Sequence, residues 1–335
     1  MRASDEPARA PLQAPVEPVP RFVERACRES GRVPSCGLSS WGEFMRLAAA
    51  LLAPIAIIAA PAAAQDSPQA ALDGLLAADR AFSEQAAGRD VVDGIAAMFG
   101  ADVVMPTRQG IVSGREAVIA ALRANANYQG QHARWRPIRG GISADGQHGF
   151  TFGYLDVEGA SPERAGRRYL AYWVRGPEGW RVAAYKQAIR QPGEVLREPL
   201  APALPARLVA PSPGAVAGHV RSVSAAESAF SERAQQVGLR TAFTEFGRAD
   251  AMNMGGRGGF VIGNQAIGGG FPEASTSPLH WGADRALAAS SGDLAVTIGT
   301  IRPNAAPPAG QPAEIPFFTI WRRDDPSQPW RYIAE

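Results

Sequence analysis

Aromatic side chains and one carboxylate recur in the middle of the sequence, and these residue types could bind an apolar molecule and act on it. The candidate ligand contacts are Trp135, Phe152, Tyr154 and Tyr172. A large aromatic ring buries about 150–250 Å² of surface, and a tyrosine hydroxyl adds a polar handle. Asp156 follows Tyr154 by two residues, so the two side chains share one face if this segment is a β-strand.

Asp156, Tyr154 and Tyr172 are also the candidate catalytic residues. A carboxylate on an aromatic strand face would be shielded from water, which raises its pKa and suits it to moving a proton on a hydrophobic substrate. The alternative is that Asp156 lies at a solvated strand end, just before Glu158 and Gly159, and has no chemical role. The sequence favours that alternative and identifies no reaction.

The patterns of a metal site, a phosphate site and a hydrolase nucleophile are missing from the sequence. The four histidines form no spacing such as H-x-x-x-H with a third carboxylate ligand. No serine lies in a G-x-S-x-G context. The glycine-rich run at 255–259 precedes a strand-like segment, whereas a phosphate cradle opens a helix. We therefore expect neither a bound metal nor a cofactor.

The composition is that of a globular protein with about two domains. The chain has 335 residues, of which 46% are hydrophobic and 20% are charged. The formal net charge is only +2, and the basic residues form no dense tract. We therefore expect no nucleic-acid partner.

Residues 45–64 have the pattern of a secretory signal peptide. A basic residue precedes an apolar stretch, which ends in three alanines at Ala64. A membrane anchor is the alternative, but a span needs about 20 apolar residues, and Pro54 and Pro61 interrupt this stretch. We therefore expect cleavage near Ala64 and a periplasmic or secreted protein without a stable membrane anchor. Residues 1–44 lack periodicity and are predicted to be disordered or a mis-annotated upstream extension.

Two parts of the sequence resemble each other in the same order, which indicates an internal duplication. Phe82-Ser83-Glu84 pairs with Phe230-Ser231-Glu232, and the same offset pairs Asp102 with Asp250. Further pairs keep this order: Trp135 with Trp281, Gly153 with Gly299, Trp173 with Trp321, and Trp180 with Trp330. A proline-rich segment separates the copies and is predicted to be a semi-extended linker. The predicted parts are a domain at 67–191, a linker at 192–217 and a domain at 218–335.

Within each copy, helical periodicity gives way to strand-like alternation. In the first copy, apolar residues recur at helical spacing in 71–87, 91–99 and 115–124, and four strand-like segments follow from Ala133 onward. Helices followed by an antiparallel sheet predict an α+β domain in which the helices cover one face of the sheet.

This element order, the segments GFTFGY and AVTIGT, and the closing segments YLAYWVRGPEGW and FFTIWRRDDPSQPW resemble the NTF2-like superfamily. Within it the chain is most similar to SnoaL-like domains and to the DUF4440 group. The resemblance implies two tandem cone-shaped domains, each with N-terminal helices packed on a curved antiparallel sheet around an apolar pocket. Members include isomerases, dehydratases, cyclases, binding modules and docking proteins, so the resemblance implies no particular reaction.

The two copies are expected to differ in their pockets. Gly268-Gly269-Gly270 stands where the first copy has its third helix, and each glycine in a helix costs about 1 kcal/mol relative to alanine. We therefore expect this helix to be replaced, and an apolar pocket to be formed in the first copy. The two copies are also expected to pack through their sheets as an intrachain pseudo-dimer, which makes the chain a monomer in solution.

Three further polar residues are candidates for special roles. Asp102 and Asp250 precede the first strand of each copy, where a carboxylate commonly caps backbone donors, and we favour this role over catalysis. Lys186 follows Tyr185 at the end of the first copy. The favoured interpretation is a solvated lysine at a strand end, and the alternative is a buried amine of lowered pKa that acts as a base or forms a Schiff base.

The preferred functional hypothesis is an exported binding or accessory protein for a hydrophobic small molecule of unknown identity. One alternative is an isomerase, dehydratase or hydrolase acting in the cone of the first domain, and another is a partner-docking protein with filled cones. An open apolar cavity with an inward carboxylate would favour the enzyme. An open cavity without a carboxylate would favour the binder, and a filled one the docking protein.

Overall fold

The chain is described as a computed structural model. The described residues are 67–125, 128, 131–159, 166–190, 195–255, 259–308 and 310–335. They all belong to one compact unit, Ala59–Glu335. The predicted signal peptide at 45–64 and the extension at 1–44 lie outside the described residues.

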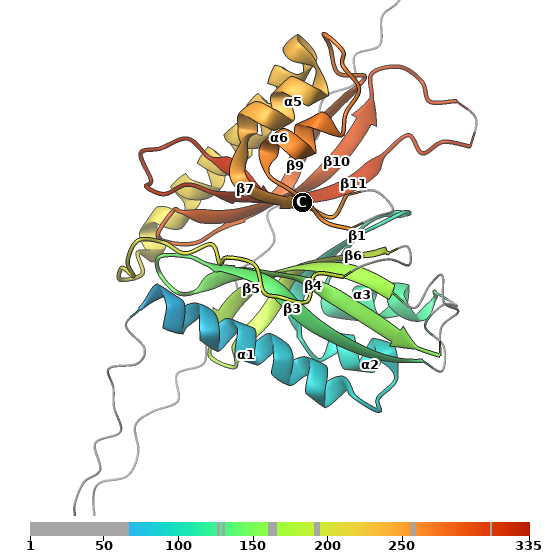
Figure 1. Ribbon diagram of the computed structural model, residues 1–335, viewed down its shortest axis with the longest axis vertical. Coiled ribbons are helices and arrows are strands. Elements are labelled where there is room, and N and C mark those ends of the chain that lie inside the picture. Colours follow the sequence, from blue (N-terminus) through green and yellow to red (C-terminus); the bar gives the residue numbers. More distant parts are fainter. Residues whose placement is uncertain are drawn as a thin grey trace, which may run out of the picture. The chain divides into compact units, whose positions relative to one another are not determined.

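The first repeat consists of three helices and a six-stranded sheet. Its helices are α1 (Pro68–Ala86), α2 (Val91–Ala96) and α3 (Arg115–Arg123). Its strands are β1 (Phe99–Thr107), β2 (Gly110–Ser113), β3 (His132–Ile142), β4 (His148–Glu158), β5 (Gly166–Gly176) and β6 (Gly179–Ile189). The strand order is β2-β1-β6-β5-β4-β3, and only β1 and β6 run parallel. The helices lie against one side of this sheet (Figure 1).

The second repeat has the same strand order. Its helices are α5 (Val216–Phe246), which follows the short 3-10 turn Pro213–Ala215, and α6 (Asn264–Gly269). Its strands are β7 (Gly247–Asn253), β8 (Val261–Ile262), β9 (Leu279–Ala288), β10 (Leu294–Pro303), β11 (Ile315–Arg322) and β12 (Arg331–Ala334). They are arranged β8-β7-β12-β11-β10-β9. The predicted α+β class is confirmed for both repeats, although each sheet is mixed, because the first strand of a repeat pairs in parallel with its last strand.

Helix α1 shows how local sequence fixes the start of each repeat. The Ser67 hydroxyl accepts a hydrogen bond from the amide of Ala70 at 3.1 Å, and Pro68 occupies the first turn, where no backbone donor is needed. Its buried positions recur every three or four residues: Leu72, Leu75, Asp79, Ser83 and Ala86. The buried stripe of this helix therefore carries an acid and a hydroxyl among its apolar residues.

The helices of the second repeat depart from those of the first. Helix α5 continues past the point where α1 and α2 separate and bends at Gly238, whose φ of 81° lies in the left-handed region. The prediction that residues 268–270 replace the third helix was wrong, because α6 forms and includes Gly268 and Gly269. A Cβ at Gly268 would collide with Thr244 and the Arg240 carbonyl, so glycine lets α6 approach α5 closely. Helix α6 is nevertheless shorter than α3, six residues against nine.

The sheet faces opposite the helices share one apolar cluster with side chains from both repeats. Its members include Phe150, Phe152, Tyr154 and Tyr172 from the first repeat, and Val296, Ile298, Phe318 and Ile320 from the second. The linker follows the edge of β3, since the Leu200 amide donates to the Ile138 carbonyl at 2.8 Å and the Ala203 amide to Gly140 at 3.0 Å. The proline-rich segment is therefore tied to the edge of the first sheet.

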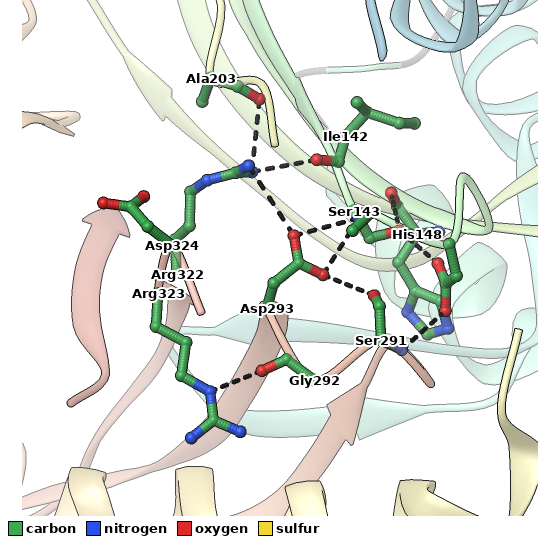
Figure 2. A network of polar contacts seen from close by, with 12 residues as sticks. Ile142, Ser143, His148, Ala203, Ser291, Gly292, Asp293, Arg322, Arg323 and Asp324 are labelled. Carbon is green, nitrogen blue, oxygen red and sulfur yellow. Dashed lines mark hydrogen bonds and ion pairs between the residues drawn. The ribbon is translucent and has the colours of Figure 1, made fainter. Parts of the chain in front are cut away.

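Two turns of equivalent position also bond to each other. Asp145, in the β3–β4 turn, accepts a hydrogen bond from the Ser290 hydroxyl at 2.7 Å, and Asp293, at the β9–β10 turn, accepts one from the Ala144 amide at 3.0 Å. Arg322 forms an ion pair of 3.8 Å with Asp293 (Figure 2). Burial raises the pKa of Asp293, although a hydrogen bond from a neighbouring serine and the charge of Arg322 oppose this. These residues form a polar contact at one end of the shared cluster.

The paired aspartates Asp102 and Asp250 do not share a role. Asp102 is exposed on β1. The Asp250 carboxylate lies 2.7 Å from the guanidinium of Arg139 and 3.0 Å from that of Arg248. The prediction of a backbone-capping carboxylate at both positions is wrong for Asp250, because arginines from the two repeats take up its oxygens instead.

Candidate functional site

The structure does not bring the four predicted ligand contacts together. Trp135 lies on the side of the first sheet that faces the helices, where its indole N–H donates to Asp79 at 2.7 Å. Phe152, Tyr154 and Tyr172 lie on the opposite side, in the cluster shared with the second repeat. Alternate residues of a strand point to opposite faces, and the sequence did not show which face the helices cover.

The predicted catalytic residues are also separated in function. Asp156 is exposed on β4, which agrees with the solvated strand end that the sequence favoured. The Tyr154 hydroxyl accepts a hydrogen bond from the Leu196 amide at 3.1 Å, and the Tyr172 hydroxyl lies 2.9 Å from Nδ1 of His148. Burial raises the pKa of Tyr172 well above its usual value, so this hydroxyl stays protonated. These contacts tie both tyrosines to neighbouring segments of the protein.

An apolar cavity of about 240 Å³ lies in the second repeat, whereas the sequence predicted a pocket in the first. Six aromatic residues line it: Phe230, Phe243, Phe271, Trp281, Phe317 and Phe318. Leu239, Leu279 and Ile301 complete the apolar wall. A second hollow of about 480 Å³ borders β1 and the β5–β6 turn, and no aromatic ring lines it. The aromatic cavity is therefore the stronger candidate for binding an apolar molecule.

A buried carboxylate, Glu227, forms one polar wall of the cavity. Its Oε1 accepts the indole N–H of Trp281 at 2.7 Å. Its Oε2 accepts the indole N–H of Trp321 at 3.0 Å and the hydroxyl of Thr297 at 2.5 Å. Burial raises the pKa of Glu227, although these hydrogen bonds favour the charged form and oppose the shift.

The first repeat contains a similar arrangement around Asp79, which occupies the position of Glu227. Asp79 accepts the indole N–H of Trp135 at 2.7 Å and the hydroxyl of Tyr169 at 2.8 Å. Neither acid was among the site residues predicted from the sequence. The signal was present, because Asp79 and Glu227 align at the constant offset of the repeats, on the buried stripe of the first helix.

A difference at the last strand accounts for the cavity. In the first repeat the Tyr185 ring is fully buried and stacks against Tyr169, with 6.4 Å between ring centroids. Counted from the aligned Trp180 and Trp330, the residue in place of Tyr185 is Glu335. A carboxylate fills less space than a phenol ring, and it lines the cavity.

Glu335 and Lys186 form the second polar wall of the cavity. The Asn253 amide donates to Glu335 Oε2 at 3.0 Å, and the Thr319 hydroxyl lies 3.4 Å from Oε1. Lys186 comes from β6 of the first repeat, and its Nζ lies 5.1 Å from the ring centroid of Phe318. The prediction of a solvated lysine at a strand end is therefore wrong, because Lys186 points into the apolar region between the sheets.

Lys186 and Glu335 shift each other's pKa values within this polar wall. Burial lowers the pKa of Lys186 to about 8, against the attraction of Glu335. Burial raises the pKa of Glu335 to about 7, against the attraction of Lys186. Near neutral pH both groups can therefore exchange protons. No group of His, Cys, Asp or Glu suited to holding a metal ion occurs among the described residues.

Comparison with known proteins gives matches only at the level of solved structures. No family model and no curated protein matches the chain. A cystatin-like domain of unknown function from Nostoc punctiforme is 20% identical over 35% of this chain and 77% of its own, with a TM-score of 0.29. An NTF2-like protein from Novosphingobium aromaticivorans is 17% identical over 35% and 80%, with a TM-score of 0.28. A ketosteroid isomerase-like protein from Erwinia carotovora is 12% identical over 35% and 95%, with a TM-score of 0.28.

These neighbours have NTF2-like, cystatin-like and ketosteroid isomerase-like folds, and each covers about a third of the chain. At such low TM-scores they carry no argument about function, and the fold assignment rests on the helices and strands themselves. Within the described residues, every helix is too short or too polar to span a lipid bilayer.

Proposed function

We propose that this chain is an exported protein that binds a small, largely apolar molecule in the cavity of the second repeat. The observation that carries the proposal is the cavity of about 240 Å³ with six aromatic rings in its wall. A cavity of about 150 Å³ lined by apolar groups takes up benzene. The larger cavity therefore suits a molecule of one or two rings. Export rests on the signal-like sequence at 45–64.

The polar wall formed by Lys186 and Glu335 indicates that the ligand also has a polar group. Lys186 supplies a donor, and Glu335 supplies an acceptor or, when protonated, a donor. A single hydroxyl or carbonyl group can pair with both, whereas a fully apolar ligand would give the Lys186 amine no hydrogen-bond partner. We therefore propose a ligand with an apolar ring system and one such polar group.

Calorimetry with naphthalenemethanol tests this function on the full mature chain. We expect saturable binding with one site per chain. Leu239→Trp should abolish it, because the larger side chain fills the cavity, and Leu196→Trp is the matched control at a surface position that is 38% exposed. Equal binding by both variants, or no binding by the wild type, would contradict the proposal.

An enzyme acting in the same cavity is the second candidate function. The observation that favours it is the inward-facing carboxylate, since an open apolar cavity with such a group is the arrangement expected of a proton-transfer enzyme. Turnover of a candidate substrate by the wild type, lost in Glu335→Gln while naphthalenemethanol still binds, would support it. Unchanged turnover in that variant would exclude Glu335 from the reaction.

A further inference from the structure

We propose that Lys186 forms a Schiff base with an aldehyde or ketone bound in the second-repeat cavity, and that Glu335 carries the proton in this step. The inference rests on the proposed function, because the carbonyl compound must enter the same cavity. It adds a covalent step and defines the ligand class as apolar carbonyl compounds.

The Lys186 amine lines the second-repeat cavity. Lys186 is the single lysine of the sequence, and it projects from β6 into the cavity wall. Its amine lies over the Phe318 ring, 5.1 Å from the centroid. Among the described residues this amine has no hydrogen bond and no ion pair within 4.0 Å. The nitrogen is therefore available to a bound molecule.

A structural role does not account well for this lysine. Lys186 is half-buried, and a cation taken partly out of water without a close partner costs free energy, so that replacing it with an apolar residue is often neutral or stabilising. The surrounding apolar side chains would pack equally well against methionine. A reactive group, by contrast, gains from such surroundings, because desolvation favours the neutral amine that acts as a nucleophile.

The groups facing Lys186 set its protonation. Glu335 follows β12, and Glu227 projects from α5 on the other side of the cavity. Asn253 of β7 and Thr319 of β11 are polar but uncharged. With its pKa lowered to about 8, Lys186 is partly neutral near neutral pH, which a lysine of ordinary pKa is not.

The proposed step conserves atoms and electrons. The lone pair of the neutral Lys186 amine attacks the carbonyl carbon, and the carbonyl π pair moves to oxygen, which takes a proton from the acid form of Glu335. The Glu335 carboxylate then removes one proton from the nitrogen, and the regenerated acid protonates the hydroxyl as it leaves as water. The nitrogen lone pair forms the C=N bond, and the remaining nitrogen proton returns to the Glu335 carboxylate. Amine and carbonyl give imine and water, and no oxidant or reductant takes part.

Reductive trapping tests the inference directly. The full mature chain is incubated with naphthaldehyde, the imine is reduced with sodium borohydride, and the products are examined by intact-mass spectrometry and peptide mapping. We expect one adduct per chain, on the peptide that contains Lys186. Lys186→Arg keeps the positive charge but should give no adduct there. Glu335→Gln should slow adduct formation at pH 9 by at least about a hundredfold, the lower end of the usual size of acid–base assistance.

Naphthalenemethanol, which has the same rings but cannot form an imine, separates the two proposals. If the alcohol binds and naphthaldehyde leaves Lys186 unmodified, the Schiff-base inference fails and the binding function stands. If the alcohol does not bind and Lys186 stays unmodified, both fail. An adduct confined to the chain's amino terminus, or an equal rate in Glu335→Gln, also overturns the inference. The rate of adduct formation should rise with pH around a pKa of about 8. A lysine with only a structural role would not give this pH profile.

Discussion

Replacing Glu227 with glutamine tests the hydrogen-bond network at the base of the cavity. The carboxylate accepts three hydrogen bonds, two of them from indole N–H groups of Trp281 and Trp321. Glutamine offers one acceptor oxygen and an NH₂ group. If the oxygen takes the place of Oε2, it keeps the bonds from Trp321 and Thr297, but the NH₂ group then faces the Trp281 N–H, donor against donor.

The size of the effect follows from that one lost bond. A buried donor without an acceptor costs about 1–3 kcal/mol. We therefore expect Glu227→Gln to lower the free energy of unfolding by about 1–3 kcal/mol. Asp79→Asn is the matched control in the first repeat, and its loss should be smaller, because the Tyr169 hydroxyl can rotate and accept from the new NH₂ group.

The pH dependence of the stability difference between wild type and Glu227→Gln is a second, independent test. Because burial raises the folded pKa of Glu227 above its ordinary 4.5, the folded state holds a proton that the unfolded state has already released. The stability from this group is present below pH 4.5 and is lost as the pH rises through the folded pKa. Glutamine does not titrate, so the difference between wild type and variant should be largest at low pH and narrow as the pH rises.

Guanidinium unfolding followed by tryptophan fluorescence, at pH 4.5 and at pH 8, measures both effects. Two results would refute the reasoning about this network. One is a Glu227→Gln variant as stable as the wild type at both pH values. The other is an Asp79→Asn variant that loses more stability than Glu227→Gln.

Three further predictions concern the cavity and the two sheets. Glu335→Tyr restores the ring that fills the first repeat, so it should abolish naphthalenemethanol binding by calorimetry; retained binding would show that this position does not open the cavity. The double variant Lys186→Met/Glu335→Leu should be more stable than the wild type by about 1–4 kcal/mol between pH 7 and 8, where both buried groups are charged. The gain in stability should become smaller below pH 7, because Glu335 takes up a proton, and above pH 8, because Lys186 loses one. Denaturant unfolding at several pH values measures this gain. A gain that does not depend on pH would contradict the assigned pKa shifts. We also propose that the chain is a monomer, because the sheet faces that could pair two subunits already pack together within one chain; a stable dimer in light scattering would disprove this.

The fold could be predicted because the repeats fixed the order of helices and strands twice over. The sequence did not show which face of the sheet the helices cover. Phe152 and Tyr154 lie on a strand that is buried on both faces, so periodicity alone did not show which side chains meet the helices. For the same reason Trp135 was grouped with residues of the opposite face.

The cavity was harder to predict because it forms where the second repeat has a smaller side chain than the first. The change from Tyr185 to Glu335 was visible in the aligned sequences, but its effect depends on the stacking of Tyr185 with Tyr169, which only the structure shows. Lys186 was assigned to solvent because the sequence placed it at a strand end, yet β6 continues to Ile189 and residues of the second repeat lie over Lys186. Contacts between repeats far apart in sequence carry no local pattern.

A crystal structure of the protein grown with naphthalenemethanol would test the central claim most directly. We predict electron density for the two rings among Phe243, Trp281 and Phe317 of the second repeat, with the hydroxyl beside Lys186 and Glu335. Density for the ligand in the first repeat or only on the surface, with the second-repeat cavity free of it, would contradict the assignment of this cavity as the binding site.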